Sequence, residues 1–270
     1  MEYADNFRLR LGKIADDGVL GDCVVEYHDT LPSTQLRARE LAGAGAGKAV
    51  VVAGEQTAGR GRLARRWESP KESGLYFSVL FRPALPAKSI HMVNIAAALS
   101  AAEAARHLLG LELELKWPND LLITRAGGYR KVCGILSESA VRDGALDYCI
   151  TGMGLNLYAP PGLTRNLEDR VGWLCENGDK IDRVELLSRT VANFLGWIYA
   201  AEREGVRIML EQYRERCASV GRVVRVETDA EIFTGLCAGI GNNGELLLET
   251  PEGTKSFHVA DVTHASLEVS

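Results

Sequence analysis

The feature that most constrains this chain is a glycine- and arginine-rich stretch between two apolar runs. Residues 49–53 and 75–81 are short, apolar and bounded by glycine or proline, so each predicts a strand. Residues 56–70 between them hold two glycines, four arginines and a tryptophan. Glycine lets backbone N–H groups turn toward an anion, and arginine binds phosphate or carboxylate through paired hydrogen bonds. The stretch therefore predicts an ordered site for a polyanion rather than a solvated basic loop.

Two other glycine patterns do not indicate nucleotide chemistry. Residues 59–64 fit G-x-G-x-x-A, but that fingerprint requires a helix to follow, and the next run is strand-like. Residues 43–48 resemble a P-loop, yet Ala42 stands at its first glycine and Ala49 at its Ser or Thr. We therefore reject a dinucleotide-binding dehydrogenase and a P-loop enzyme.

Charge and cysteine usage narrow the class of protein. The net charge of −5 disfavours a general nucleic-acid coat, so the arginines indicate a local site. The cysteines form no C-x-x-C pair and the histidines no H-E-x-x-H pattern, which favours free thiols in the cytoplasm over a zinc site. We find no signal peptide and no membrane-spanning apolar run. Residues 1–22 are too few for a winged-helix domain, so we expect no DNA binding.

The periodicity of the rest predicts an α+β chain in two folded parts. Further strands are expected at 23–27, 111–117, 131–138 and 145–157. A hairpin bearing Arg125 and Arg130 is expected between the strands at 111–117 and 131–138. Helices are expected at 36–42, 90–109 and 183–204, and another after residue 204 that ends at about residue 217. From residue 221, five short runs separated by tight turns predict a small β-barrel. The expected division is an extension at 1–22, a large domain at 23–217 and a barrel at 218–270.

Four separated segments share glycine, cationic or amide groups at strand ends and loops: 33–35, 56–67, 116–120 with 131–134, and 152–156. Their patterns G-R-G-R-x-x-x-x-W, K-W-P-N-D, K-x-x-G-I-L and G-x-G-x-N, in this order, closely resemble the biotin–protein ligase family from about Val24 to the C-terminus. The chain departs at Gln35, where many members have Asn, and at Ala64, where Gly is common. No N-terminal winged helix-turn-helix is visible, so the resemblance implies a monofunctional ligase.

The resemblance implies a class II synthetase-like catalytic domain, a mixed sheet flanked by helices, followed by an SH3-like barrel. It also implies that biotin and ATP, with Mg²⁺, form biotinyl-5′-adenylate and pyrophosphate. A lysine of a biotin carboxyl carrier protein domain would then take the biotinyl group. An anionic carboxylate meets a triphosphate in the first step, so cations are the expected tools. The arginine-rich loop is expected to close over the adenylate and shield it from water.

The resemblance also implies roles for individual residues. Biotin-binding positions are Ser33, Thr34, Gln35, Gln56, Gly59, Arg60, Lys131 and Gly134. ATP and adenylate positions are Arg62, Trp67, Asn119, Lys131 and Asn156. Catalytic positions are Lys131, Arg60, Arg62 and Asp120, and no protein cage for a metal is expected. Asp120 is expected either to assist the second step or to hold Mg²⁺, and both roles stay open.

Plainer roles compete for some of these residues. Ser33 or Thr34 fits the N-cap of a helix, and Asp120 fits the cap of the turn after Pro118. Trp117 is expected in the core, and Lys116 fits an exposed strand position.

Two other functions compete with the biotin ligase. One is a related lipoate or octanoate ligase, which the G-R-G-R-x-x-x-x-W loop disfavours. The other is a non-enzymatic biotin-binding regulator, disfavoured because every charged group that the chemistry needs is present. The carrier domain is expected to dock by edge-strand pairing, a surface that in the family can also serve a homodimer.

Overall fold

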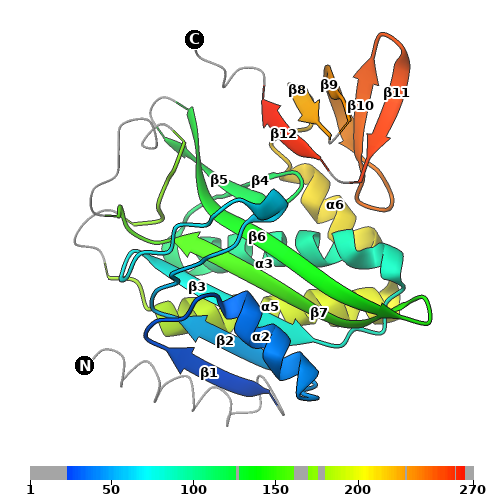
Figure 1. The fold of residues 1–270 in the computed structure, drawn as a ribbon. Coiled ribbons are helices and arrows are strands. Elements are labelled where there is room, and N and C mark those ends of the chain that lie inside the picture. The colour runs from blue at the N-terminus through cyan, green and yellow to red at the C-terminus, as the bar shows by residue number, and fades with distance from the viewer. Residues whose placement is uncertain are drawn as a thin grey trace.

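A computed structural model describes residues 23–125, 128–160, 170–175, 180–228, 230–258 and 260–264. The extension predicted at residues 1–22 lies outside this range. Within it, a large mixed sheet with helices on both faces stands beside a smaller antiparallel sheet (Figure 1). The predicted α+β fold class is therefore confirmed.

The main sheet has seven strands in the order β1-β2-β3-β7-β6-β5-β4. Their bounds are β1 Val24–His28, β2 Ala49–Ala53, β3 Gly74–Phe81, β4 Glu114–Lys116, β5 Asp120–Arg125, β6 Gly128–Arg142 and β7 Ala145–Asn156. β1 pairs parallel with β2, and the other pairs are antiparallel. Every residue of β2 and β3 is buried, because helices cover both faces of the sheet at these strands.

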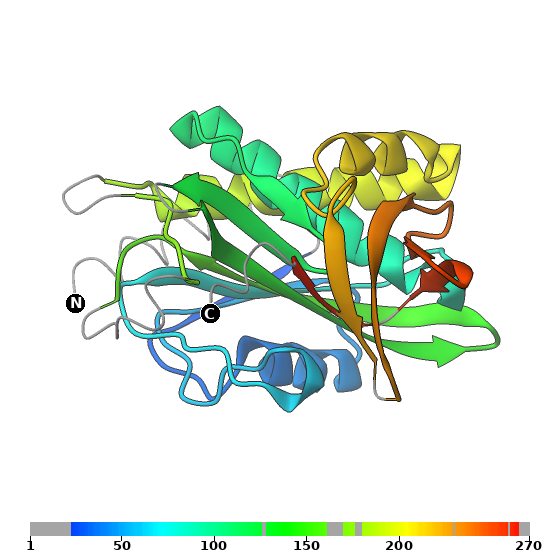
Figure 2. The same cartoon turned by 90° about the horizontal axis from the view of Figure 1, so that it is seen from above.

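The helices divide between the two faces of the main sheet (Figure 2). Helix α2, Thr34–Gly43, packs on β2, β3 and β7, whereas α3, Ile90–Leu109, and α5, Arg183–Glu204, pack together on the opposite face. Seven alanines of α3 are buried, and their small side chains let the helix approach both the sheet and α5. The short helix α6, Arg207–Glu215, leads toward the smaller sheet. Two 3₁₀ turns lie at Arg62–Ala64 and Ala87–Ser89.

The smaller C-terminal sheet has five antiparallel strands in the order β11-β10-β9-β8-β12. Their bounds are β8 Val223–Glu227, β9 Ile232–Ile240, β10 Leu246–Thr250, β11 Gly253–Phe257 and β12 Asp261–His264. Val224, Val226 and Leu248 fill its buried face. Trp117, 3% exposed, donates from Nε1 to the carbonyl of Gly244 at 2.8 Å and so links the two sheets. The expected core role of Trp117 is confirmed.

One strand prediction needs correction and one is confirmed. The expected strand at 111–117 is only Glu114–Lys116, whereas the expected hairpin bearing Arg125 and Arg130 is formed by β5 and β6. Alternating hydrophobicity shows which side chains face the core, but not which backbone groups find a partner. β4 stops where it does because Lys116 faces Asp120 across a three-residue turn, and only three residue pairs form.

All six cysteines are free thiols, as predicted. Among the described residues, no helix has the length and apolar character needed to cross a membrane.

Candidate active site

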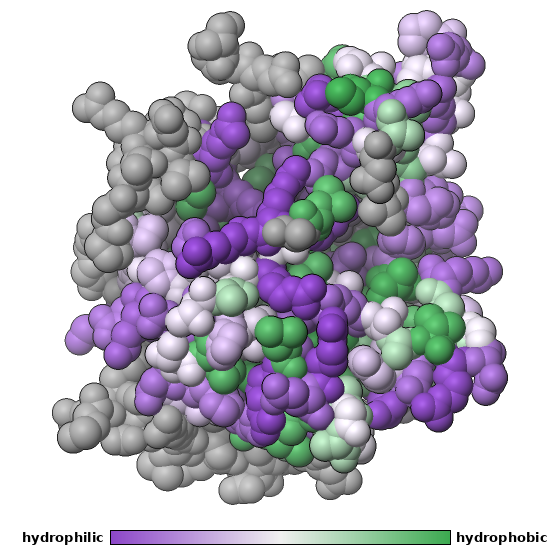
Figure 3. Space-filling model, in the orientation of Figure 1, coloured by the Kyte–Doolittle hydropathy of each residue, from purple (hydrophilic) through white to green (hydrophobic). Residues whose placement is uncertain are grey.

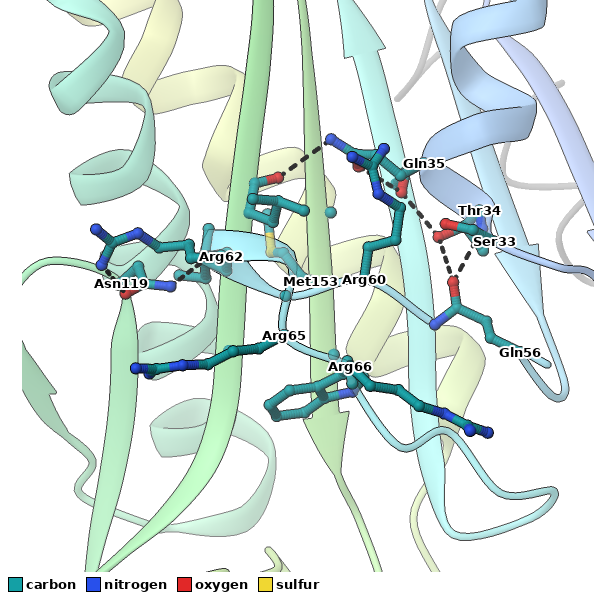
Figure 4. A pocket seen from close by; sticks show the side chains of 18 of the residues that line it. Ser33, Thr34, Gln35, Gln56, Arg60, Arg62, Arg65, Arg66, Asn119 and Met153 are labelled. Carbon is teal, nitrogen blue, oxygen red and sulfur yellow. Dashed lines mark hydrogen bonds between the residues drawn. The ribbon is translucent and has the colours of Figure 1, made fainter. Parts of the chain in front are cut away.

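The four predicted segments meet at one cavity of about 250 Å³ on the α2 face of the main sheet. Residues 59–67 form a small hairpin over it, which we call the arginine hairpin; its backbone bonds are Trp67 N–H to Gly59 O at 3.0 Å and Gly61 N–H to Arg65 O at 2.8 Å. Figure 4 shows Arg62 and Asn119 on one side of the cavity and Thr34, Gln35 and Gln56 on the other. Hydrophilic side chains gather over the middle of this face (Figure 3).

One wall of the cavity is a connected set of polar groups. Gln56 Oε1 accepts from the Thr34 N–H at 2.9 Å, and the Thr34 hydroxyl lies 2.8 Å from that of Ser78. Ser78 in turn donates to Gln35 Oε1 at 3.1 Å, while Gln35 Nε2 donates to the carbonyl of Ile150 at 3.0 Å. Ser33 is the N-cap residue of α2, as expected, but its side chain makes no capping hydrogen bond. We call Thr34, Gln35, Gln56 and Ser78 the polar wall.

The floor beside the polar wall is flat because two glycines face each other across β6 and β7. Gly134 and Gly154 are register partners, and the Trp67 indole lies directly over them. A Cβ on Gly154 would sit 2.3 Å from Trp67 Nε1, and one on Gly134 would sit 2.7 Å from the indole ring. Only glycine permits this approach. Trp67 Nε1 is buried without a hydrogen-bond partner among the described residues.

Three of the predicted cations also line the cavity, Lys131 and Arg62 away from the polar wall and Arg60 beside Gln35 (Figure 4), and each is paired. Lys131 Nζ lies 2.6 Å from Asp120 Oδ1 and 5.1 Å from the centre of the Trp67 ring. Arg60 reaches Glu138 of β6 at 3.3 Å. Arg62 donates to Asn119 Oδ1 at 3.2 Å and lies 3.8 Å from Asp261. Burial lowers the pKa of the Arg62 guanidinium, although nearby Asp261 and Asp120 oppose this. An anion that displaced these carboxylates would meet a preformed cationic wall.

The arginine hairpin also rests on the C-terminal sheet. Arg62 donates twice to the carbonyl of Ala260, at 3.3 Å and 3.2 Å, and Arg65 forms an ion pair with Asp261. The loop that closes the cavity is therefore held from two sheets.

The site fits Mg²⁺ only as an ion that arrives with phosphate ligands. Among the described residues, no group of three His, Cys, Asp or Glu side chains could hold a metal. Asp120 is the candidate protein ligand: its Oδ1 is buried, and Lys131 approaches it within ion-pair distance but outside hydrogen-bond geometry. Mg²⁺ commonly takes one or two carboxylates and completes its shell with phosphates and water.

Most predicted site residues do line the cavity. They are Ser33, Thr34, Gln35, Gln56, Arg60, Arg62, Trp67, Asn119, Asp120, Lys131 and Gly134. Two do not. Gly59 lines a second cavity of about 330 Å³ on the outer side of the hairpin. Asn156 donates to the carbonyls of Gly172 at 3.0 Å and Lys131 at 3.4 Å, so it braces the backbone.

The cavity also contains residues that sequence reasoning did not assign. Ser78 is fully buried, and a polar residue within an otherwise apolar strand was the available signal. Phe77, Ile135, Leu136 and Met153 supply apolar lining. Asp261 comes from β12, and nothing local in its sequence marks it, because only the tertiary fold brings it to Arg62 and Arg65.

Comparison with known proteins identifies related chains. Residues 29–156 match the profile of the Biotin/lipoate A/B protein ligase family, and residues 220–264 match the Biotin protein ligase C terminal domain. The chain is 33% identical to the bifunctional ligase/repressor BirA of Bacillus subtilis over 90% of this chain and 74% of that one. It is 30% identical to biotin--[acetyl-CoA-carboxylase] ligase of Paracoccus denitrificans, over 85% of this chain and 96% of that one.

Solved structures of biotin protein ligases share this fold. A biotin protein ligase from Aquifex aeolicus, solved with biotin and ATP, superposes with a TM-score of 0.74 at 25% identity, covering 90% of this chain and 99% of that one.

Proposed function

Since the chain belongs to the biotin protein ligase family, we propose that it joins biotin to ATP as biotinyl-5′-adenylate and transfers the biotinyl group to a carrier lysine. The observation that carries this proposal is the meeting of Arg60, Arg62 and Lys131 with the polar wall in one cavity. A cyclic urea and a carboxylate at opposite ends of biotin require these two kinds of surface.

The ureido ring of biotin fits the polar wall. The ring offers N–H donors and a carbonyl acceptor, and Thr34, Gln56 and Ser33 present hydroxyl and amide groups at the α2 end of the cavity. The thiophane ring and the valeryl chain then lie against the apolar lining of Ile135 and Met153, beside the Trp67 indole that covers the glycine floor. The amides of Gln35 and Gln56 are each bonded at both ends in this structure. We assign Gln35 to holding the wall in place, and Gln56 would bind the ring by exchanging one of its present hydrogen bonds.

The cations serve the first chemical step. A biotin carboxylate oxygen attacks the α-phosphorus of ATP, the new P–O bond forms, and the bond to pyrophosphate breaks. Negative charge grows on the phosphoryl and leaving oxygens, and Lys131, Arg60 and Arg62 would stabilise it. Mg²⁺, when bound with ATP, would neutralise part of the triphosphate charge, with Asp120 as its candidate protein ligand.

The second step transfers the acyl group to a protein. An uncharged lysine amine of a biotin carboxyl carrier protein domain attacks the acyl carbon of the mixed anhydride, and AMP leaves. Asp120, which lines the cavity, is available to take the proton that the amine loses. Closure of the arginine hairpin would keep water from the anhydride until the carrier arrives.

The polar wall favours biotin over lipoate and octanoate, which have no polar group at the far end of their chains. An apolar tail against the Thr34 hydroxyl and the Gln56 amide would form no hydrogen bond with them, whereas the ureido ring of biotin would. Each hydrogen bond forgone is worth about 0.5–1.5 kcal/mol, so two of them give a discrimination of roughly five- to a hundredfold.

Pyrophosphate release tests this proposal directly. Purified protein with MgATP is supplied with biotin, lipoate, octanoate or no acid. We expect pyrophosphate release with biotin alone when each acid is supplied at low concentration. Release with lipoate or octanoate in preference to biotin would show that the protein is a lipoate or octanoate ligase instead. Tight biotin binding without release under any condition would indicate a binding protein.

A further inference from the structure

One carboxylate of the site stands between two lysines. In β4, Leu115 is fully buried in the core, so Lys116 projects from the other face of the strand. Asp120 is its register partner across the β4–β5 pair, a relation that puts two Cβ atoms within about 4.5–5.5 Å. Lys131 of β6 reaches the same Asp120 from the opposite side, with Nζ 2.6 Å from Oδ1.

The two lysines are not equivalent. Lys131 has its ion pair with Asp120, whereas Lys116 has no hydrogen bond or ion pair within the part of the chain that the structure describes. Burial lowers the pKa of the Lys116 ammonium; Asp120 and Asp261 raise it, while Lys131 and Arg65 lower it further. Lys116 is thus a half-buried cation among charged neighbours, without a bonded partner of its own.

The pairing of Lys131 with Asp120 conflicts with the role proposed for Lys131. A lysine that is neutralised by a carboxylate stabilises a phosphoryl oxygen poorly. If Lys131 turns to the substrate, Asp120, whose side chain is only 18% exposed, would lose its ion-pair partner. A carboxylate left unpaired in a partly buried site is strongly disfavoured. A cation must take its place, and besides a Mg²⁺ that arrives with ATP, the cross-strand neighbour Lys116 is a protein group that can supply one.

We propose that Lys116 is this replacement: when Lys131 moves to the substrate phosphoryl group, the Lys116 ammonium closes on Asp120. Lys116 is then a positioning residue that acts through Asp120 and releases Lys131 for the first step. The exchange forms and breaks no covalent bond. It rests on the proposed function, because it presumes that Lys131 acts on a phosphoryl group.

The test is a double-mutant cycle on the rate of adenylate formation. Wild type, Lys116→Met, Asp120→Asn and the double variant are mixed with saturating biotin and MgATP, and single-turnover rates are recorded. Met keeps most of the length of the lysine side chain, and Asn keeps the shape of Asp. Lys116→Arg restores the charge, and Lys88→Met is the matched control at an exposed lysine outside the cavity. Thermal unfolding and biotin binding check that each variant is folded.

The exchange predicts that Lys116→Met slows adenylate formation at least tenfold in the wild-type background but less than twofold when Asp120 is already Asn. Lys116→Arg should recover most of the rate. An equal loss in both backgrounds would overturn the proposal, because Lys116 would then act independently of Asp120. No loss in either would overturn it as well. If wild type itself forms no adenylate, the proposed function fails first, and the two failures are thereby distinguished.

Discussion

Gly154 determines how closely the arginine hairpin can approach the sheet. The Trp67 indole rests where a Cβ would be, so Gly154→Ala must push the indole and the hairpin outward. We expect biotin affinity to fall at least tenfold, measured by isothermal titration, with little change in global stability. Gly196→Ala is the matched control, because a Cβ there meets nothing within 4 Å. Unchanged affinity in Gly154→Ala would remove Trp67 from the binding surface.

Lys131 is the residue on which the adenylation chemistry depends most. Lys131→Ala should slow biotin-dependent pyrophosphate release by about 10²–10³-fold, the usual cost of removing one transition-state donor. Biotin binding should change only a few-fold, because the polar wall is intact. Both quantities are measured on the same preparation. A near-normal rate would show that Lys131 has no part in the chemical step.

The polar wall offers a second test at single-residue scale. Ser78→Ala leaves Gln35 Oε1 and the Thr34 hydroxyl short of one partner in a fully buried position. We expect the free energies of unfolding and of biotin binding to become less favourable by about 1–3 kcal/mol in total. Urea unfolding with and without saturating biotin separates the two shares. A variant identical to wild type in both measurements would show that this hydroxyl is dispensable.

At the scale of elements, the arginine hairpin is held closed from the C-terminal sheet. Asp261→Ala removes the carboxylate partner of Arg62 and Arg65, so the closed position is weakened. We expect biotinyl-adenylate to escape into solution several-fold faster. Release of the radiolabelled adenylate is measured by a filtration assay. Asp147→Ala is the control, since Asp147 also binds two arginines, Arg82 and Arg142, outside the cavity. Equal escape from both variants would show that the contact of Asp261 with Arg62 and Arg65 does not hold the hairpin closed.

The elements also show what sequence could and could not predict. Helices α3 and α5 were predicted with their observed bounds, because long apolar periodicity and local caps define such helices. β5 was expected only as one arm of a hairpin, without bounds, because its six residues owe their conformation to β4 and β6 on either side. Most of the candidate site was predicted because its residues are clustered in short motifs. Ser78 and Asp261 were not, because each reaches the cavity only through tertiary contacts.

At the scale of the whole molecule, His264 makes the junction between the two sheets sensitive to pH. It is fully buried, its Nε2 lies 3.1 Å from Ser219 Oγ, and its ring meets Tyr129 edge to face. Burial, with Lys116 and Arg222 nearby, lowers its pKa to about 4. The unfolded chain therefore binds a proton that the folded chain does not, and stability falls as pH drops from about 6.5 to about 4.

Replacing His264 should remove this part of the pH dependence. Between pH 7 and pH 4.5, the unfolding free energy of His264→Gln should decline less than that of wild type, by about 2 kcal/mol. Urea unfolding at several pH values measures the difference. His107→Gln, at an exposed position near the end of α3, is the control. Parallel curves for wild type and His264→Gln would show that another group sets the acid sensitivity of the junction.

The complete reaction proposed for this protein runs from free biotin to a biotinylated carrier protein. The most direct measurement is the intact mass of a biotin carboxyl carrier protein domain after incubation with the enzyme, biotin and MgATP. We predict a gain of one biotinyl group on a single lysine, abolished by omitting ATP and by replacing that lysine. An unmodified carrier, under conditions in which biotin-dependent pyrophosphate release proceeds, would contradict the transfer that the account assigns to this protein.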